Sequence, residues 1–152
     1  MAAAIRPHQP EDFEALYQLD QQCYPPEIAY SRQEMKLYLR LPGADCLVAE
    51  QDGALEGFIV TAREDDLGHV ITLDVAEAQR RRGIGTALLA AAEERMFKAG
   101  VHQVWLETAT NNQAAVAFWE KHGYRTLGVL KDYYLEKLDA YEMRKRLVQR
   151  PN

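Results

Sequence analysis

The segment after Val75 carries the residue types of an anion-binding turn. An apolar, strand-like run ends at Val75, and a basic stretch with two glycines then opens a helix-like run: Arg80, Arg81, Arg82, Gly83, Ile84, Gly85 and Thr86. Unpaired amides at a helix start carry about half a positive charge in total, and glycine lets the backbone approach a phosphate closely. The turn therefore predicts a phosphorylated cofactor, although a solvated arginine face followed by a plain turn has the same composition.

Two other phosphate-binding motifs do not fit this spacing. A dinucleotide site would need G-x-G-x-x-G in a parallel βαβ unit with an acidic residue at the end of the second strand, and only Gly83-Ile84-Gly85 is present. A nucleotide P-loop would need G-x-x-x-x-G-K-[ST], which the sequence lacks. Both interpretations are excluded by spacing.

The elements that must position this turn alternate along the chain. In the first half, Ser31-x-x-Glu34 is a capping-box pattern and Asp52-Gly53 is a strong hairpin-turn signal. We therefore expect a strand at Ile5 to Arg6, a helix from Pro10 to about Gln21, a helix from Ser31 to about Leu41, and a hairpin of Cys46 to Glu50 with Leu55 to Arg63.

In the second half, apolar residues recur at helical spacing after the arginine turn. We expect a strand from about His69 to Val75, a helix from Ile84 to Ala99, a strand from Val101 to Thr108, a helix from Asn111 to His122, and strands at Tyr124 to Leu130 and Asp139 to Leu147. This order predicts a mixed α/β fold with a mostly antiparallel sheet and one βαβ crossover.

Length and composition indicate one domain, residues 1–152, because no repeat, low-complexity tract or linker divides the chain. A net charge of −5 argues against sequence-independent nucleic-acid binding and weakly favours a cationic substrate. The apolar stretches fall short of the roughly 20 residues that a membrane span needs, and the first residues do not form a leader. We therefore expect a cytoplasmic protein with neither a membrane nor a nucleic-acid partner.

The cysteines and histidines do not have metal-ligand spacing. Cys23 and Cys46 are expected to be free, partly buried thiols, and we expect neither zinc nor a disulfide. No histidine is assigned a role from the sequence, and His122 beside Gly123 is expected to act as a cation at a helix C-terminus.

The arginine turn and its surroundings resemble the GNAT superfamily of acetyltransferases, whose coenzyme A pyrophosphate motif is [QR]-x-x-G-x-[GA]. In order and spacing, the chain is similar to the RimI-like branch, the ribosomal-protein alanine N-acetyltransferases, over nearly its whole length. The segments that carry the resemblance are Arg80-Arg81-Arg82-Gly83-Ile84-Gly85, Thr72-Leu73-Asp74-Val75, Trp105-Leu106-Glu107, Asn111-Asn112-x-Ala114-Ala115 and Phe118-Trp119-Glu120-Lys121-His122-Gly123-Tyr124. The resemblance implies a seven-stranded sheet flanked by about four helices, and acetyl-coenzyme A as co-substrate.

The resemblance also implies where the cofactor lies. Its pantetheine arm would pair with Leu73, Asp74 and Val75, and its pyrophosphate would lie on Arg81 to Thr86, with Arg80 adding charge nearby. Asn112 would hydrogen-bond the cofactor further along. A strand that splays from its neighbour leaves unpaired amides, so the arm would bind as an added strand.

Acetyl transfer to an amine needs a neutral nitrogen, a polarised thioester and a leaving thiolate. Glu107 shares a strand face with Gln103 and Trp105, and by the resemblance it is the general base, accepting the amine proton through a water. Trp119 stands where the family has a tyrosine that protonates the thiolate, and an indole N–H is not a useful acid. Trp119 is therefore expected to pack and to line the cofactor. The thiolate either leaves unassisted or takes a proton from Tyr133 or Tyr134.

The acceptor is the least readable part of the sequence. Tyr133 and Tyr134 resemble paired tyrosines that contact peptide substrates, and Tyr24 begins a segment expected to shape the pocket. Because an α-amino group titrates near about 8 and lysine near about 10.4, a single carboxylate base suits the α-amine better. We therefore expect a protein or peptide N-terminus as acceptor, with a small-molecule amine or a catalytically weak acyl-coenzyme A-binding module as alternatives. For the oligomeric state, we expect a monomer or a homodimer.

Overall fold

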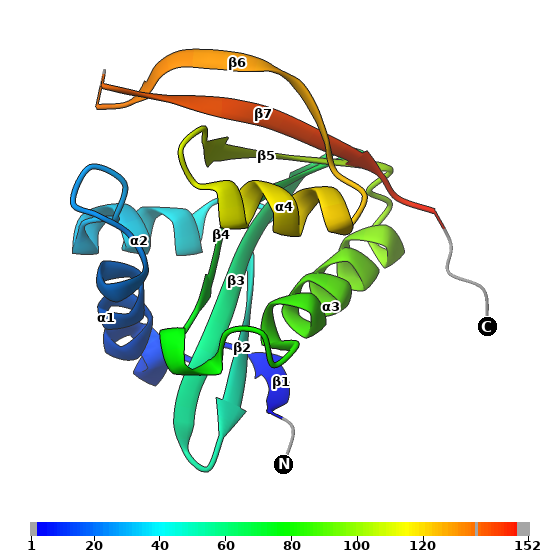
Figure 1. Cartoon of the computed structure of the whole chain (residues 1–152). Coiled ribbons are helices and arrows are strands. Elements are labelled where there is room, and N and C mark those ends of the chain that lie inside the picture. The colour runs from blue at the N-terminus through cyan, green and yellow to red at the C-terminus, as the bar shows by residue number, and fades with distance from the viewer. Residues whose placement is uncertain (1–2, 136, 149–152) are drawn as a thin grey trace.

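A computed structural model of the chain describes residues 3–135 and 137–148 (Figure 1). The described residues form one seven-stranded sheet in the order β1-β2-β3-β4-β5-β7-β6. Its strands are β1 (Ala4–Pro7), β2 (Asp45–Gln51), β3 (Ala54–Glu64), β4 (Leu67–Val75), β5 (Gln103–Ala109), β6 (Arg125–Tyr134) and β7 (Leu138–Arg146). The helices are α1 (Phe13–Cys23), α2 (Arg32–Arg40), α3 (Ile84–Lys98) and α4 (Gln113–Lys121), with short 3-10 turns η1 (Pro10–Asp12) and η2 (Glu77–Gln79).

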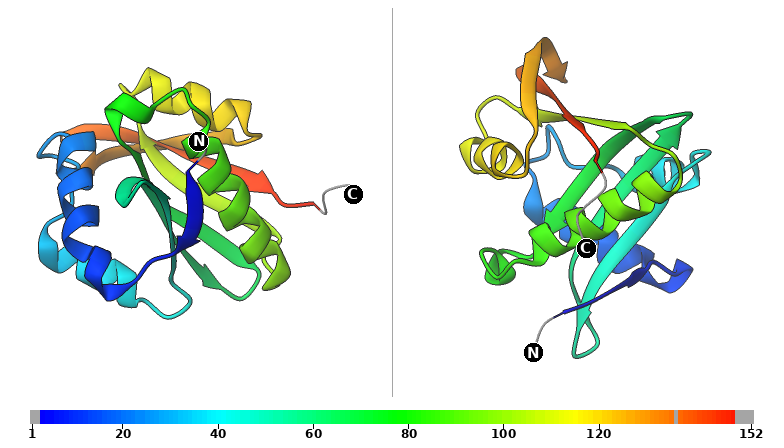
Figure 2. Two further views of the ribbon diagram at one scale, coloured as in Figure 1. Left: turned by 90° about the horizontal axis from the view of Figure 1, so that it is seen from below. Right: turned by 90° about the vertical axis from the view of Figure 1, so that its right-hand side faces the viewer.

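Helices cover both faces of the sheet (Figure 2). Successive strand residues point to opposite sides, so the central strands have apolar side chains on both faces for these helices to bury. On β2, Leu47 and Ala49 pack in a core with α3 and α4, whereas Cys46 and Val48 pack in a second core with α1 and α2. The strand β3 alternates in the same way. Two apolar layers therefore hold the central strands.

The strands β4 and β5 form the parallel pair of the sheet, and α3 is the crossover between them. Their pairing covers only Leu67–His69 against Gln103–Trp105. Beyond these residues β4 stays paired with β3 up to Val75, and β5 stays paired with β7 up to Ala109. The two strands therefore diverge toward their carboxyl ends (Figure 1).

The mixed, mostly antiparallel fold predicted from the sequence is confirmed. The Ser31 hydroxyl accepts from Glu34 N at 3.1 Å while the Glu34 carboxylate accepts from Ser31 N at 2.9 Å, so the capping box forms. The hairpin turn has positive φ at both Asp52 and Gly53. One strand differs clearly: β6 continues to Tyr134, four residues beyond the predicted end at Leu130, because β-bulges let it stay paired with β7. No described helix is long and apolar enough to cross a membrane.

Candidate active site

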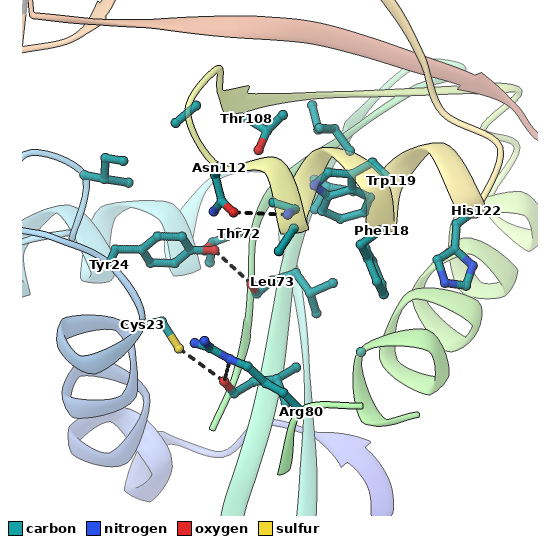
Figure 3. A pocket seen from close by; sticks show the side chains of 18 of the residues that line it. Cys23, Tyr24, Thr72, Leu73, Arg80, Thr108, Asn112, Phe118, Trp119 and His122 are labelled. Carbon is teal, nitrogen blue, oxygen red and sulfur yellow. Dashed lines mark hydrogen bonds between the residues drawn. The ribbon is translucent and has the colours of Figure 1, made fainter. Parts of the chain in front are cut away.

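The divergence of β4 and β5 opens a cavity of about 780 Å³ (Figure 3). It is bounded by the second half of β4, the end of β5, the segment that follows α1, the first turn of α3, and α4. One continuous cavity therefore joins the arginine turn to the strand that carries Glu107.

Carbonyl groups along the open edge of β4 accept hydrogen bonds from side chains. Leu73 O accepts from the Tyr24 hydroxyl at 2.9 Å, and Val75 O accepts from Cys23 Sγ at 3.4 Å and from Arg80 Nε at 3.1 Å (Figure 3). Burial raises the pKa of the Cys23 thiol to about 11, so the thiol keeps its proton. The N–H and C=O of one strand residue point to the same edge, so the amides of Leu73 and Val75 also face the open side. This edge suits a ligand that pairs like an added strand.

The first turn of α3 differs from the first turns of α2 and α4. Ser31 caps α2 and Asn112 caps α4, with Asn112 Oδ1 accepting from Ala115 N at 3.1 Å, whereas α3 has no side-chain cap among the described residues. Its N-cap, Gly83, is left-handed at φ +82°, and a Cβ there would meet nothing within 4 Å. The open space beside Gly83 therefore adjoins the uncapped amides of the first turn of α3, and such an arrangement binds an anion.

Four cationic or titratable side chains line the cavity. Arg80 and Arg81 come from the turn, and Lys121 and His122 come from α4. His122 Nε2 lies 3.0 Å from the hydroxyl of Thr86 in the first turn of α3. These groups fit a ligand that carries phosphates.

Glu107 lies on β5 between two hydrogen-bonding side chains. His69 Nε2 on β4 is 2.8 and 3.0 Å from its two carboxylate oxygens, and the Tyr133 hydroxyl donates to Oε1 at 3.0 Å. The His69 ring stacks on Trp105 with centroids 4.7 Å apart. Only 11% of the Glu107 side chain is exposed. The carboxylate is therefore fixed in orientation at the cavity wall.

Trp119 is buried, lines the cavity, and packs edge-on against Phe118 and Tyr124. It thus has the packing role expected from the sequence. Tyr134 also lines the cavity, and burial raises its pKa to about 12. Burial and the neighbouring Glu107 also raise the pKa of Tyr133, whose proton is directed at that carboxylate.

Most residues predicted for the site meet at this cavity. The lining includes Tyr24, Leu73, Val75, Arg80, Arg81, Gly83, Gly85, Thr86, Glu107, Asn112, Trp119 and Tyr134.

Four predicted site residues do not line the cavity with their side chains. Asp74 points the opposite way from Leu73 and Val75 because strand side chains alternate, and Ile84 is buried in the α3 core. Arg82 is exposed in the turn, and Tyr133 contacts the lining residues Glu107 and Tyr134 without lining the cavity itself.

Asp74 instead contacts a second buried carboxyl group, Asp20 on α1. The two carboxyl groups interact strongly, an arrangement that favours a proton shared between them. Among the described residues, nothing donates a hydrogen bond to Asp20 Oδ1 or Asp74 Oδ2. Burial raises the pKa of both groups, that of Asp74 most strongly. The pair ties α1 to the strand that edges the cavity.

Sequence reasoning missed His69, Phe118, Lys121 and His122. Metal-ligand spacing does not reveal the histidines, because His69 and His122 act here as hydrogen-bond partners of Glu107 and Thr86. Alternation places His69 on the same face of β4 as Ile71, which packs toward α1 and α2 and lines the cavity, whereas a register shift at Ile71 puts Leu73 on the other face. The contact of His69 with Glu107 depends on the register between β4 and β5, which cannot be predicted from the local sequence.

The chain matches the family model described as Acetyltransferase (GNAT) family over residues 13–124. An N-alpha-acetyltransferase of Sulfurisphaera tokodaii is 36% identical over 109 residues, which cover 63% of this chain and 65% of that protein. A ribosomal protein bS18 alanine N-acetyltransferase of Escherichia coli is 31% identical over 84 residues, 55% of this chain and 57% of that protein. The chain thus spans between about half and two thirds of the length of most of these curated relatives.

Solved structures match over almost the whole chain. Ard1 from Thermoplasma volcanium superposes with a TM-score of 0.90 at 26% identity, covering 98% of this chain and all of that one. The ribosomal-protein-S18-alanine N-acetyltransferase from Escherichia coli superposes with a TM-score of 0.87 at 23% identity, covering 99% of this chain and 97% of that one, and shows the same fold. The diverging strands, the uncapped α3 and the family match agree, and the chain belongs to the GNAT family of acetyltransferases.

Proposed function

We propose that this chain transfers an acetyl group from acetyl-coenzyme A to the N-terminal α-amino group of a protein or peptide. One observation carries the proposal: a single cavity connects an uncapped, basic helix start with a carboxylate held by two hydrogen-bonding side chains. The first feature suits the phosphates of a coenzyme, and the second suits removal of a proton from an amine. The N-alpha-acetyltransferase names of several relatives support the same acceptor.

The residues present fit coenzyme A, whose acetylated form supplies the reactive thioester when bound. The amides of Leu73 and Val75 would pair with its pantetheine arm, and the free amides of the α3 start, with Arg80 and Arg81, would hold its pyrophosphate. Asn112 lines the cavity and keeps its amide nitrogen available while its oxygen caps α4.

Glu107 is the proposed general base. A neutral amine must attack the thioester carbonyl, so the excess proton has to leave the nitrogen, directly or through one water, for a carboxylate oxygen. His69 and Tyr133 keep that carboxylate oriented, and stacking on Trp105 fixes the His69 ring. His69 is thereby proposed as a positioning residue that the sequence did not predict.

Protonation of the departing thiolate is assigned to Tyr134. Trp119 has no acidic proton, and the Tyr133 proton is directed at Glu107. Tyr134 lines the cavity, and a pKa raised to about 12 keeps its phenol protonated at neutral pH.

The proposed acceptor enters between the segment after α1 and the end of β6. Tyr24, Ile28, Tyr30 and Tyr134 line this part of the cavity, and they offer aromatic and apolar surface rather than a charged subsite. An α-amine is also deprotonated at lower cost than a lysine side chain. A cytoplasmic location, a single domain over residues 1–152, and a monomeric or homodimeric state are further proposals from the sequence.

A thiol-release assay with acetyl-coenzyme A tests the proposal. The acceptors are a peptide with a free N-terminus and no lysine, the same peptide with a blocked N-terminus and one lysine, and a panel of small amines. We expect release with the first peptide, and mass spectrometry should place the acetyl group on its α-nitrogen. Release with small amines alone would reassign the acceptor. Binding of coenzyme A without release by any acceptor would contradict catalysis.

A further inference from the structure

The C-terminal end of α4 meets the first turn of α3 through one polar contact. His122, which lines the cavity (Figure 3), has its Nε2 3.0 Å from Oγ1 of Thr86, another lining residue. The His122 ring is held against Phe118, with centroids 4.6 Å apart. An ionisable ring is thus fixed beside the place where the pyrophosphate is expected.

Thr86 belongs to the uncapped start of α3. The first hydrogen bond within the helix is donated by Ala87 N to Gly83 O at 2.9 Å, so the amides of Ile84, Gly85 and Thr86 precede it and have no intrahelical acceptor. The Thr86 hydroxyl lies on the same turn as these amides. Its proton would strengthen an anion site if it pointed at the anion.

The direction of the Thr86 hydrogen bond depends on whether Nε2 of His122 carries a proton, which it always does in the imidazolium. When Nε2 of a neutral imidazole accepts, the Thr86 hydroxyl donates its hydrogen bond to the ring. Only the lone pairs of the hydroxyl oxygen then face the cavity. When the imidazolium donates from Nε2, the hydroxyl oxygen accepts, and its proton is free to donate to a phosphate oxygen.

We propose that His122 is a positioning residue for coenzyme A: it becomes protonated as the cofactor binds and turns the Thr86 hydroxyl toward the pyrophosphate. Cofactor binding is then linked to uptake of a proton. This inference goes beyond acetyl transfer and rests only on the cofactor of the proposed function.

The charges around His122 agree with this linkage. Burial lowers the pKa of His122 below its usual value, Glu93 on α3 raises it, and Lys121 and Lys145 lower it. Arg80 and Arg81 line the same cavity. Without a ligand the ring is therefore neutral at pH 7, and the negative charges of a pyrophosphate beside it favour the charged form.

Calorimetric titration of coenzyme A, without any acceptor, tests the proposal at pH 6, 7 and 8 in two buffers with different ionisation enthalpies. The wild-type protein should take up more protons on binding than His122→Asn. Its affinity should also fall about three- to tenfold more between pH 6 and 8. The titration of the cofactor's own 3′-phosphate, with a pKa near about 6, is common to both proteins and cancels in the comparison.

Three variants separate this role from a merely structural one. Thr86→Val should lose the linkage, Thr86→Ser should keep it because it retains the hydroxyl, and His102→Asn is a matched control outside the cavity. Dephospho-coenzyme A should show the same linkage, since it keeps the pyrophosphate. Equal proton uptake by wild type and His122→Asn, or linkage only when the 3′-phosphate is present, would overturn the inference. Equal uptake would leave acetyl transfer untouched, whereas absence of any binding would overturn both.

Discussion

At the scale of single residues, Glu107 combines two properties that chemistry on an amine needs. It is nearly buried, so its orientation is fixed, and it opens onto the cavity where a nitrogen would stand. Two neighbours hydrogen-bond it without neutralising it through an ion pair with lysine or arginine. A carboxylate in this setting keeps the capacity to accept a proton.

Replacing Glu107 by glutamine should remove that capacity and keep the shape of the site. We expect kcat/KM near neutral pH to fall about 10²- to 10⁴-fold, and the loss to shrink as rising pH deprotonates the amine in solution. The pH profile of acetyl transfer measures this. Glu94→Gln, an exposed α3 residue paired with Lys98, is the control and should behave as wild type. A parallel loss at every pH would contradict the role of base.

Because Trp119 has no acidic proton, a second prediction concerns the residue that protonates the departing thiolate. If Tyr134 protonates the thiolate, Tyr134→Phe should lower turnover about tenfold or more, since general acid catalysis contributes at least that much. Adding Trp119→Tyr to this variant should restore part of the rate, because it supplies a phenol on the cavity wall. Single-turnover measurements with the two variants check this. Unchanged turnover in Tyr134→Phe would show that the thiolate leaves unassisted.

Among the secondary-structure elements, the turn before α3 has two roles that can be tested separately, one in folding and one in ligand binding. Gly83 closes the turn in a left-handed conformation, and it leaves room where a phosphate would lie. Gly53 in the β2–β3 turn has nearly the same φ, +80°, and equally open surroundings, but it lies outside the cavity. The two glycines are therefore a matched pair.

Gly83→Ala and Gly53→Ala should each lose about 1 kcal/mol of stability, because a left-handed residue with a Cβ is strained. Only Gly83→Ala should also weaken coenzyme A binding, by about tenfold or more, since its methyl group would occupy the anion site. Urea unfolding and calorimetric titration measure the two effects. Equal affinity in both variants would remove the turn from the cofactor site.

Local chemistry predicted most helices and strands, and it brought most of the proposed site residues to one cavity. The capping box at Ser31, the Asp52-Gly53 hairpin and the arginine turn each depend on neighbouring residues, and these were predicted correctly. The contact of His69 with Glu107 joins two strands separated by a helical crossover, and it depends on their register. Alternation between Leu73 and Val75 turns Asp74 to the other face of β4, and this follows from the sequence alone.

At the scale of the whole molecule, the Asp20–Asp74 pair makes stability depend on pH. Burial raises the pKa of both carboxyl groups, so the folded chain holds a proton that the unfolded chain releases above about pH 4. Stability contributed by this proton is complete below that pH and declines as pH rises toward the folded pKa of the pair.

Asp74→Asn should flatten this dependence. The amide is neutral at every pH and can donate to Asp20, so the variant should be more stable than wild type at pH 8, by about 1–3 kcal/mol. Urea midpoints between pH 5 and 8 measure the slopes. Exposed Asp66→Asn is the control. The same slope in wild type and Asp74→Asn would show that the pair does not share a proton.

The brief pairing of β4 with β5 also has a mechanical consequence. Only three residues of each strand join the part of the sheet formed by β1 to β4 to the part formed by β5 to β7. A molecule bound between β4 and β5 would contact both parts of the sheet and hold them together. Amide hydrogen exchange should then slow on both β4 and β5 when coenzyme A is added, and the cofactor would contribute to the rigidity of the sheet as well as to the reaction.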